Sequence, residues 1–79
     1  MSTMKKEDRI MAESVYKVIE LVGTSTSSWE DATRAAIEMA GQHLDELRIG
    51  EVTKLDVTIE NGSVKTFRSK INVSFKYHD

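Results

Sequence analysis

Residues 64–77 alternate between apolar and polar side chains, and this alternation constrains the fold more than any other feature of the chain. One parity carries Phe67, Ile71, Val73, Phe75 and Tyr77, and the other carries Arg68, Lys70, Asn72, Ser74 and Lys76. Because successive side chains of a strand point to opposite faces of a sheet, the pattern predicts a strand with one buried face. Another part of the chain must cover that face.

A second strand is predicted over residues 49–60, and the short sequence ENGS joins it to the first. One face of this strand carries Thr53, Leu55, Val57 and Ile59. A two-residue Asn-Gly turn would set Leu55 opposite Arg68, an apolar residue against a charged one. We therefore predict a three-residue loop over 60–62 with its glycine left-handed, which sets Leu55 opposite Phe67.

A further strand is predicted over residues 15–22, VYKVIELV, because this run is short, β-branched and nearly continuous. Both of its faces are apolar. One carries Tyr16, Val18 and Val22, and the other carries Val15, Ile19 and Leu21. A strand of this kind is stable only when both faces are buried.

The segment 22–31, VGTSTSSWED, has two interpretations, a phosphate-binding loop or a capped helix start. A phosphate loop needs several glycines and a lysine, whereas Gly23 stands alone and no lysine follows it. Ser28 precedes Asp31 by three residues, and Ser27 precedes Glu30 by three, which is the spacing of a capping box. We therefore predict a helix cap.

A helix is predicted from Trp29 to about Leu44, with an apolar stripe rich in alanine. The stripe consists of Trp29, Ala32, Ala36, Met39, Ala40 and Leu44. Trp29 is expected to cover the core at the helix start. The element order is then β-α-β-β, an α+β fold in which the last strand can lie between the first two, antiparallel to both.

One helix covers only one face of a sheet, so the apolar residues on the other face of the first strand predict an assembly. The chain has 79 residues and no cysteine, so disulfides cannot stabilise it. Self-association is the remaining route to added stability.

Composition narrows the classes of function. A net charge of -2 gives no reason to expect nucleic acid or a membrane as partner, and no apolar run is long enough to span a membrane. No nucleophile stands beside a base, and no metal motif occurs, so we expect no enzyme. The default expectation is a cytoplasmic protein.

The segments VYKVIELVGTS, SWEDA, LRIGEV, DVTIENGSV and FRSKINVSFKY, in this order and spacing, resemble the dodecin family. The resemblance implies a three-stranded antiparallel sheet wrapped around one helix and twelve copies forming a hollow shell. It divides the chain into a flexible N-terminal extension, 1–13, and a dodecin-like domain, 14–79. The best-known dodecins store or buffer flavins, bound in pairs between subunits, without catalysis.

The resemblance also implies a cofactor site formed by Ile49, Arg68, Arg48 and Glu51. Flavin-binding dodecins have a tryptophan two residues before the Glu-Val of the second strand, where this chain has Ile49. They have a glutamine after an aromatic residue of the last strand, where this chain has Arg68. The pattern is similar to a dodecin subgroup that lacks this tryptophan and is associated with calcium.

Several of these residues have a second interpretation. Arg48 and Arg68 suit intersubunit ion pairs, with Glu51 or Asp56 as partner. Calcium needs about six to eight oxygens, which a symmetric shell could assemble from several chains. The available carboxylates, which equally suit a solvated acidic face, are Asp45, Glu46, Glu51, Asp56 and Glu60. His43 is expected to be a polar helix residue without a metal, and His78 belongs to the tail.

Three functional hypotheses stay open. The first is a dodecameric store for a small ligand, with riboflavin or FMN as the family expectation. The second is a dodecamer that binds calcium, or is purely structural, and holds no flavin. The third is a small adaptor with an exposed sheet face, which would be a monomer or dimer.

Overall fold

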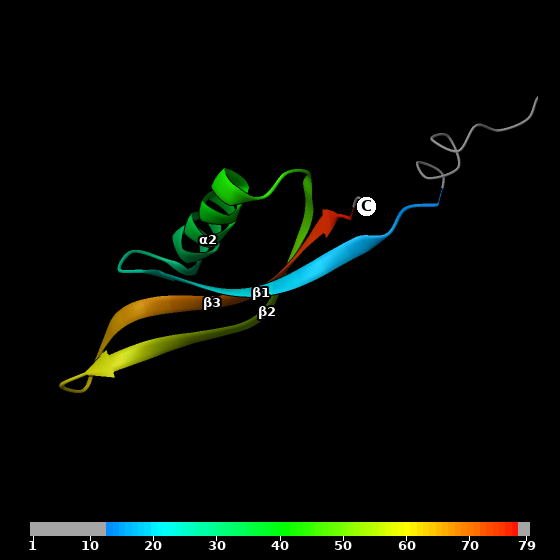
Figure 1. The fold of residues 1–79 in the computed structure, drawn as a ribbon. Coiled ribbons are helices and arrows are strands. Elements are labelled where there is room, and N and C mark those ends of the chain that lie inside the picture. The colour runs from blue at the N-terminus through cyan, green and yellow to red at the C-terminus, as the bar shows by residue number, and fades with distance from the viewer. Residues whose placement is uncertain (1–12, 78–79) are drawn as a thin grey trace, which may run out of the picture.

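The computed structural model describes residues 13–77, so residues 1–12 of the predicted extension and His78 lie outside the described part. The elements follow the predicted β-α-β-β order (Figure 1). They are β1 (Tyr16–Ser25), α2 (Trp29–His43), β2 (Leu47–Glu60) and β3 (Ser63–Lys76). β1 begins one residue later than predicted and ends three residues later, and β2 begins two residues earlier than predicted. β3 begins and ends one residue earlier than predicted.

The three strands form one sheet in the order β1-β3-β2. The central strand β3 is antiparallel to both neighbours, which confirms the predicted topology. The helix lies over one face of the sheet (Figure 1). Within residues 13–77 no other element covers the opposite face, which we call the helix-free face.

The core lies between α2 and β3. Ile71 and Val73 are buried and pack with Ala36, as the alternation and the alanine stripe predicted. Half-buried residues complete this cluster, namely Ile19, Leu21, Ile37 and Leu47. Met39 of the predicted stripe is instead 59% exposed, because it lies where α2 passes the edge of β1.

Gly23 allows α2 to lie against the backbone of β1. A Cβ atom at this position would lie 1.9 Å from the carbonyl oxygen of Ala32 and 3.0 Å from the Cβ of Ala36. Any larger residue would therefore collide with the helix backbone itself. The glycine of the segment VGTS serves helix packing and not anion binding.

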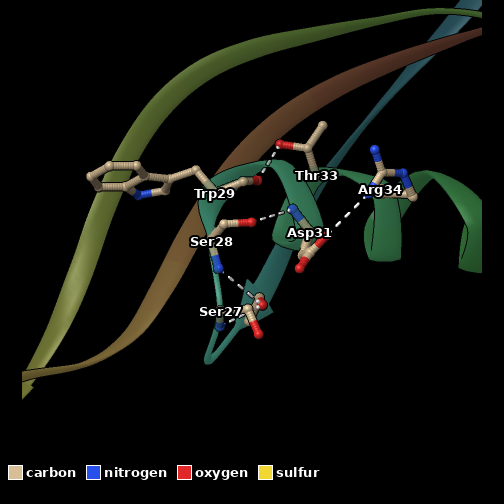
Figure 2. A network of polar contacts seen from close by, with 7 residues as sticks. Ser27, Ser28, Trp29, Asp31, Thr33 and Arg34 are labelled. Carbon is tan, nitrogen blue, oxygen red and sulfur yellow. Dashed lines mark hydrogen bonds and ion pairs between the residues drawn. The ribbon is translucent and has the colours of Figure 1, made fainter.

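The helix start carries the predicted cap. The Ser28 hydroxyl accepts a hydrogen bond from the Asp31 amide at 3.0 Å, and Ser28 has extended backbone angles (Figure 2). The Asp31 carboxylate does not complete the capping box, because it pairs with Arg34 at 3.0 Å. The Ser28 amide donates instead to the Ser25 hydroxyl at 3.4 Å, so Ser25 supplies the second half of the cap.

The predicted three-residue loop between β2 and β3 is wrong. Glu60 pairs with Ser63, and the turn consists of Asn61 and Gly62 alone, both with positive φ, at 53° and 77°. These angles belong to a type I′ turn, which Asn-Gly favours.

A bulge next to this turn places odd-numbered residues of β2 opposite odd-numbered residues of β3, which is the pairing that the three-residue loop was predicted to give. The register shifts between Thr58 and Ile59, so Val57, and not Leu55, lies opposite Phe67. The amide of Thr66 donates to the Thr58 hydroxyl at 3.1 Å, which supplies a partner beside the interrupted ladder. The apolar residues of both strands therefore share a face as predicted, but a two-residue turn and a bulge produce this arrangement.

Candidate ligand site

The helix-free face carries a shallow groove between the ends of β1 and β2. It has a volume of about 280 Å³ and is lined by Val18, Ile49, Glu51, Asn72 and Ser74. The register explains this set, because Ile49 lies opposite Ser74, and Glu51 opposite Asn72. The side chains offer an aliphatic wall, a carboxylate, an amide and a hydroxyl.

Two predicted site residues, Ile49 and Glu51, meet in this groove. Ile49 is 66% exposed, the second-highest value among the large hydrophobic residues of the described part. Its carbonyl oxygen accepts a weak hydrogen bond from the Ser74 hydroxyl at 3.4 Å. Glu51 is exposed and has no ion-pair partner among residues 13–77.

Arg68 lies on the same face but farther along β3, away from the groove. Its Nε atom is 2.8 Å from Oδ1 of Asp56, the residue opposite it on β2, and its terminal nitrogen is 3.5 Å from Oδ2. Both side chains are about two-fifths exposed. The predicted pairing of Arg68 with Asp56 thus occurs inside one chain.

The backbone of Asp56 also contacts Trp29, the only tryptophan of the chain. The indole N–H of Trp29 donates to the Asp56 carbonyl oxygen at 3.0 Å, and the ring meets Phe67 edge-on with centroids 5.1 Å apart. Trp29 therefore packs on Phe67 at the helix start, beside the core cluster and not within it, and it fixes the backbone next to the Arg68–Asp56 pair. Arg48 is exposed and falls at a register irregularity between Leu47 and Ile49.

The sequence did not predict three of the groove residues as ligand residues, namely Val18, Asn72 and Ser74. Their signal was available in the alternation, since Asn72 and Ser74 share the outward parity of β3 with Arg68. What the alternation could not supply is the register, which decides where along β2 these residues meet Ile49.

A single chain offers no complete metal site within the part that the structure describes. No three histidine or carboxylate side chains gather there closely enough to hold an ion. No three of the five carboxylates considered for calcium therefore lie together in one chain. Within residues 13–77, no helix is long and apolar enough to cross a membrane.

Comparison with known proteins gives the family. The Dodecin family model matches residues 15–78. The calcium dodecin of Mycobacterium tuberculosis is 41% identical over 63 residues, which cover 80% of this chain and 89% of that protein. The dodecin of Thermus thermophilus is 37% identical over 65 residues, covering 82% of this chain and 94% of the relative.

Solved structures agree with these sequence matches. The Streptomyces coelicolor dodecin superposes with a TM-score of 0.82 at 33% identity, covering 87% of this chain and 99% of that one. The crystal structure of the M. tuberculosis calcium dodecin, described as having a novel calcium-binding site, gives a TM-score of 0.75 at 40% identity. It covers 82% of this chain and 93% of that structure.

The fold and the family match together define a binding protein that is not an enzyme. The chain belongs to the dodecin family, whose members form homododecamers and bind small ligands.

Proposed function

We propose that this chain assembles with itself into a homododecamer and holds a small ligand in the groove of the helix-free face, without catalysing a reaction. The observation that carries the proposal is the set of apolar side chains that β1 and β2 leave uncovered on that face. Tyr16, Val18 and Val22 of β1 are 49%, 58% and 49% exposed there, beside Ile49. Glu20 lies between Val18 and Val22 on this face, where it pairs with Lys70. Exposed apolar side chains gathered along one strand in this way mark association surfaces.

The open groove supports the same proposal. Ligand sites surround most of a small molecule, whereas one chain provides only a shallow wall on one side. A second copy laid on the helix-free face would bury the apolar side chains and close the groove together. Binding and assembly are therefore coupled in this proposal.

Calcium is the ligand that the groove supports best. Glu51 offers a carboxylate, Asn72 an amide oxygen and Ser74 a hydroxyl, all hard oxygen donors. Calcium takes about six to eight oxygens, so two or more copies must contribute to one ion. The similarity to a protein named calcium dodecin supports this choice.

Riboflavin or FMN is the second candidate, favoured by the exposed Ile49 at the position of the family's stacking tryptophan. An aliphatic side chain can contact an isoalloxazine ring but cannot stack on it. No aromatic residue lines the groove, and the guanidinium of Arg68 already pairs with Asp56. We therefore place flavin second to calcium.

Binding to the purified full-length protein tests these candidates. Calcium titrated calorimetrically should bind saturably, and Glu51→Gln should weaken it at least tenfold, because a charged ligand is lost. Glu38→Gln, at an exposed position on α2, is the matched control and should leave binding unchanged. Calcium affinity unaffected by Glu51→Gln would contradict the placement of the site.

Flavin is tested in parallel by quenching of riboflavin fluorescence. Ile49→Trp should raise riboflavin affinity about tenfold or more, since it restores a stacking surface worth about 1 kcal/mol beyond its buried area. Glu38→Trp adds the same ring at an exposed position on α2, outside the groove, and serves as control. If the unmodified chain binds riboflavin tightly and does not bind calcium, flavin and not calcium is its ligand.

A further inference from the structure

A second uncovered apolar surface lies on the opposite side of β1, between that strand and α2. This groove, the α2–β1 groove, has a volume of about 540 Å³. Ile19 and Leu21 form its floor, and Ala35 and Met39 line it from the helix. No lysine, arginine or carboxylate lines this groove, so an apolar occupant would displace water without burying the charge of such a group.

The chain also exposes an apolar surface near the β2–β3 turn, where α2 does not lie over the sheet. The turn between β2 and β3 stands apart from α2 (Figure 1). Three apolar residues at the turn end of this hairpin are exposed, Leu55 at 49%, Ile59 at 69% and Val64 at 54%. Their register places them on the face that α2 covers elsewhere, since Ile59 lies opposite Val64, and Leu55 opposite the buried Ser69. We call these three residues the hairpin patch.

We infer that the hairpin patch of one copy docks in the α2–β1 groove of a second copy. The hairpin cannot reach its own groove, because β2 and β1 are the two opposite edges of the sheet, separated by β3. Both surfaces are apolar, and each is left open by its own chain. The inference rests on the proposed homo-oligomer and names an interface within it.

The contact is head-to-tail, because each chain has one hairpin patch and one α2–β1 groove and the two differ. Such heterologous contacts close into rings when the rotation permits. Neither the hairpin patch nor the α2–β1 groove lies on the helix-free face, so that face can form a different contact and bind the ligand. A closed shell needs more than one kind of contact, and these two surfaces supply two.

Cysteine cross-linking tests the contact directly, because the chain has no cysteine of its own. In the assembled full-length protein, Ala35→Cys combined with Ile59→Cys should give covalent multimers with a short thiol cross-linker. Ala35→Cys combined with Lys54→Cys is the control, since Lys54 lies opposite Lys70 on the helix-free face. Assembled particles without cross-links between positions 35 and 59 would overturn the inference.

A second variant covers the possibility that the cysteines perturb the surface. Ile59→Asp should shift the particle mass to smaller species, whereas Ser63→Asp, beside the turn and off the hairpin patch, should leave it unchanged. Ile59 is two-thirds exposed, so the replacement leaves the folded chain intact. An unchanged mass for Ile59→Asp would overturn the inference.

The outcomes separate this inference from the proposed function. A monomeric unmodified protein would overturn both the homododecamer and the docking. An oligomeric protein whose mass is lowered by Met39→Asp, but without cross-links between positions 35 and 59, would retain the shell. It would show that another part of a second copy covers the α2–β1 groove.

Discussion

Gly23 and Gly41 show how differently two glycines of one chain are used. A Cβ at Gly23 meets the Ala32 carbonyl at 1.9 Å, whereas a Cβ at Gly41 meets only Leu47 Cδ1 at 3.8 Å. The first glycine sets the distance between β1 and α2. The second merely lowers helix propensity near the end of α2.

Substitution by alanine should separate these roles. Gly23→Ala should destabilise the protein by about 3 kcal/mol or more, because the obstacle is backbone and cannot rotate away. Gly41→Ala should stabilise it by up to about 1 kcal/mol, the difference in helix propensity. Urea unfolding at fixed protein concentration measures both. A neutral Gly23→Ala would contradict the close approach of β1 and α2.

Residue identities predicted local contacts well and long-range polar contacts poorly. The Ser28 cap follows from spacing along the chain, so the sequence contains it. Ser69 was absent from the predicted buried set because its type is polar, yet it is fully buried and its hydroxyl lies 2.7 Å from that of Thr33. The Thr33 oxygen is also 2.9 Å from the Trp29 carbonyl, so the buried Ser69 hydroxyl and the half-buried Thr33 hydroxyl both have partners.

At the scale of elements, helix and strand identity followed from periodicity, whereas strand ends and register did not. β1 continues through Gly23, Thr24 and Ser25, which the sequence assigned to a loop, because these residues pair with β3. The alternation predicted correctly that the apolar sets of β2 and β3 share a face. It could not show that a two-residue turn and a bulge, and not a longer loop, achieve this.

The turn itself gives a prediction for the β2–β3 hairpin. Gly62→Ala should destabilise the protein by about 1 kcal/mol, because a Cβ disfavours the positive φ of 77°. Gly62→Asn should cost less, since asparagine tolerates that region. The order of the urea midpoints checks this, and equal losses for the two variants would contradict a type I′ turn.

For the whole molecule, the apolar residues on both faces of β1 correctly indicated a surface that one helix cannot cover. The candidate site was harder to predict. Ile49 and Glu51 do meet in the groove, but Arg68 lies six residues from Ser74 along β3 and is held by Asp56. The resemblance supplied these positions one at a time, and only the register shows which of them one chain brings together.

Native mass spectrometry of the full-length protein, purified without added ligand, tests the central proposal most directly. We expect a mass of twelve chains, with excess mass that corresponds to bound calcium and disappears after chelation. A bare dodecamer that takes up neither calcium nor riboflavin would leave the shell but remove its ligand. A monomer or dimer at every concentration tested would contradict the proposed assembly and, with it, the coupled binding site.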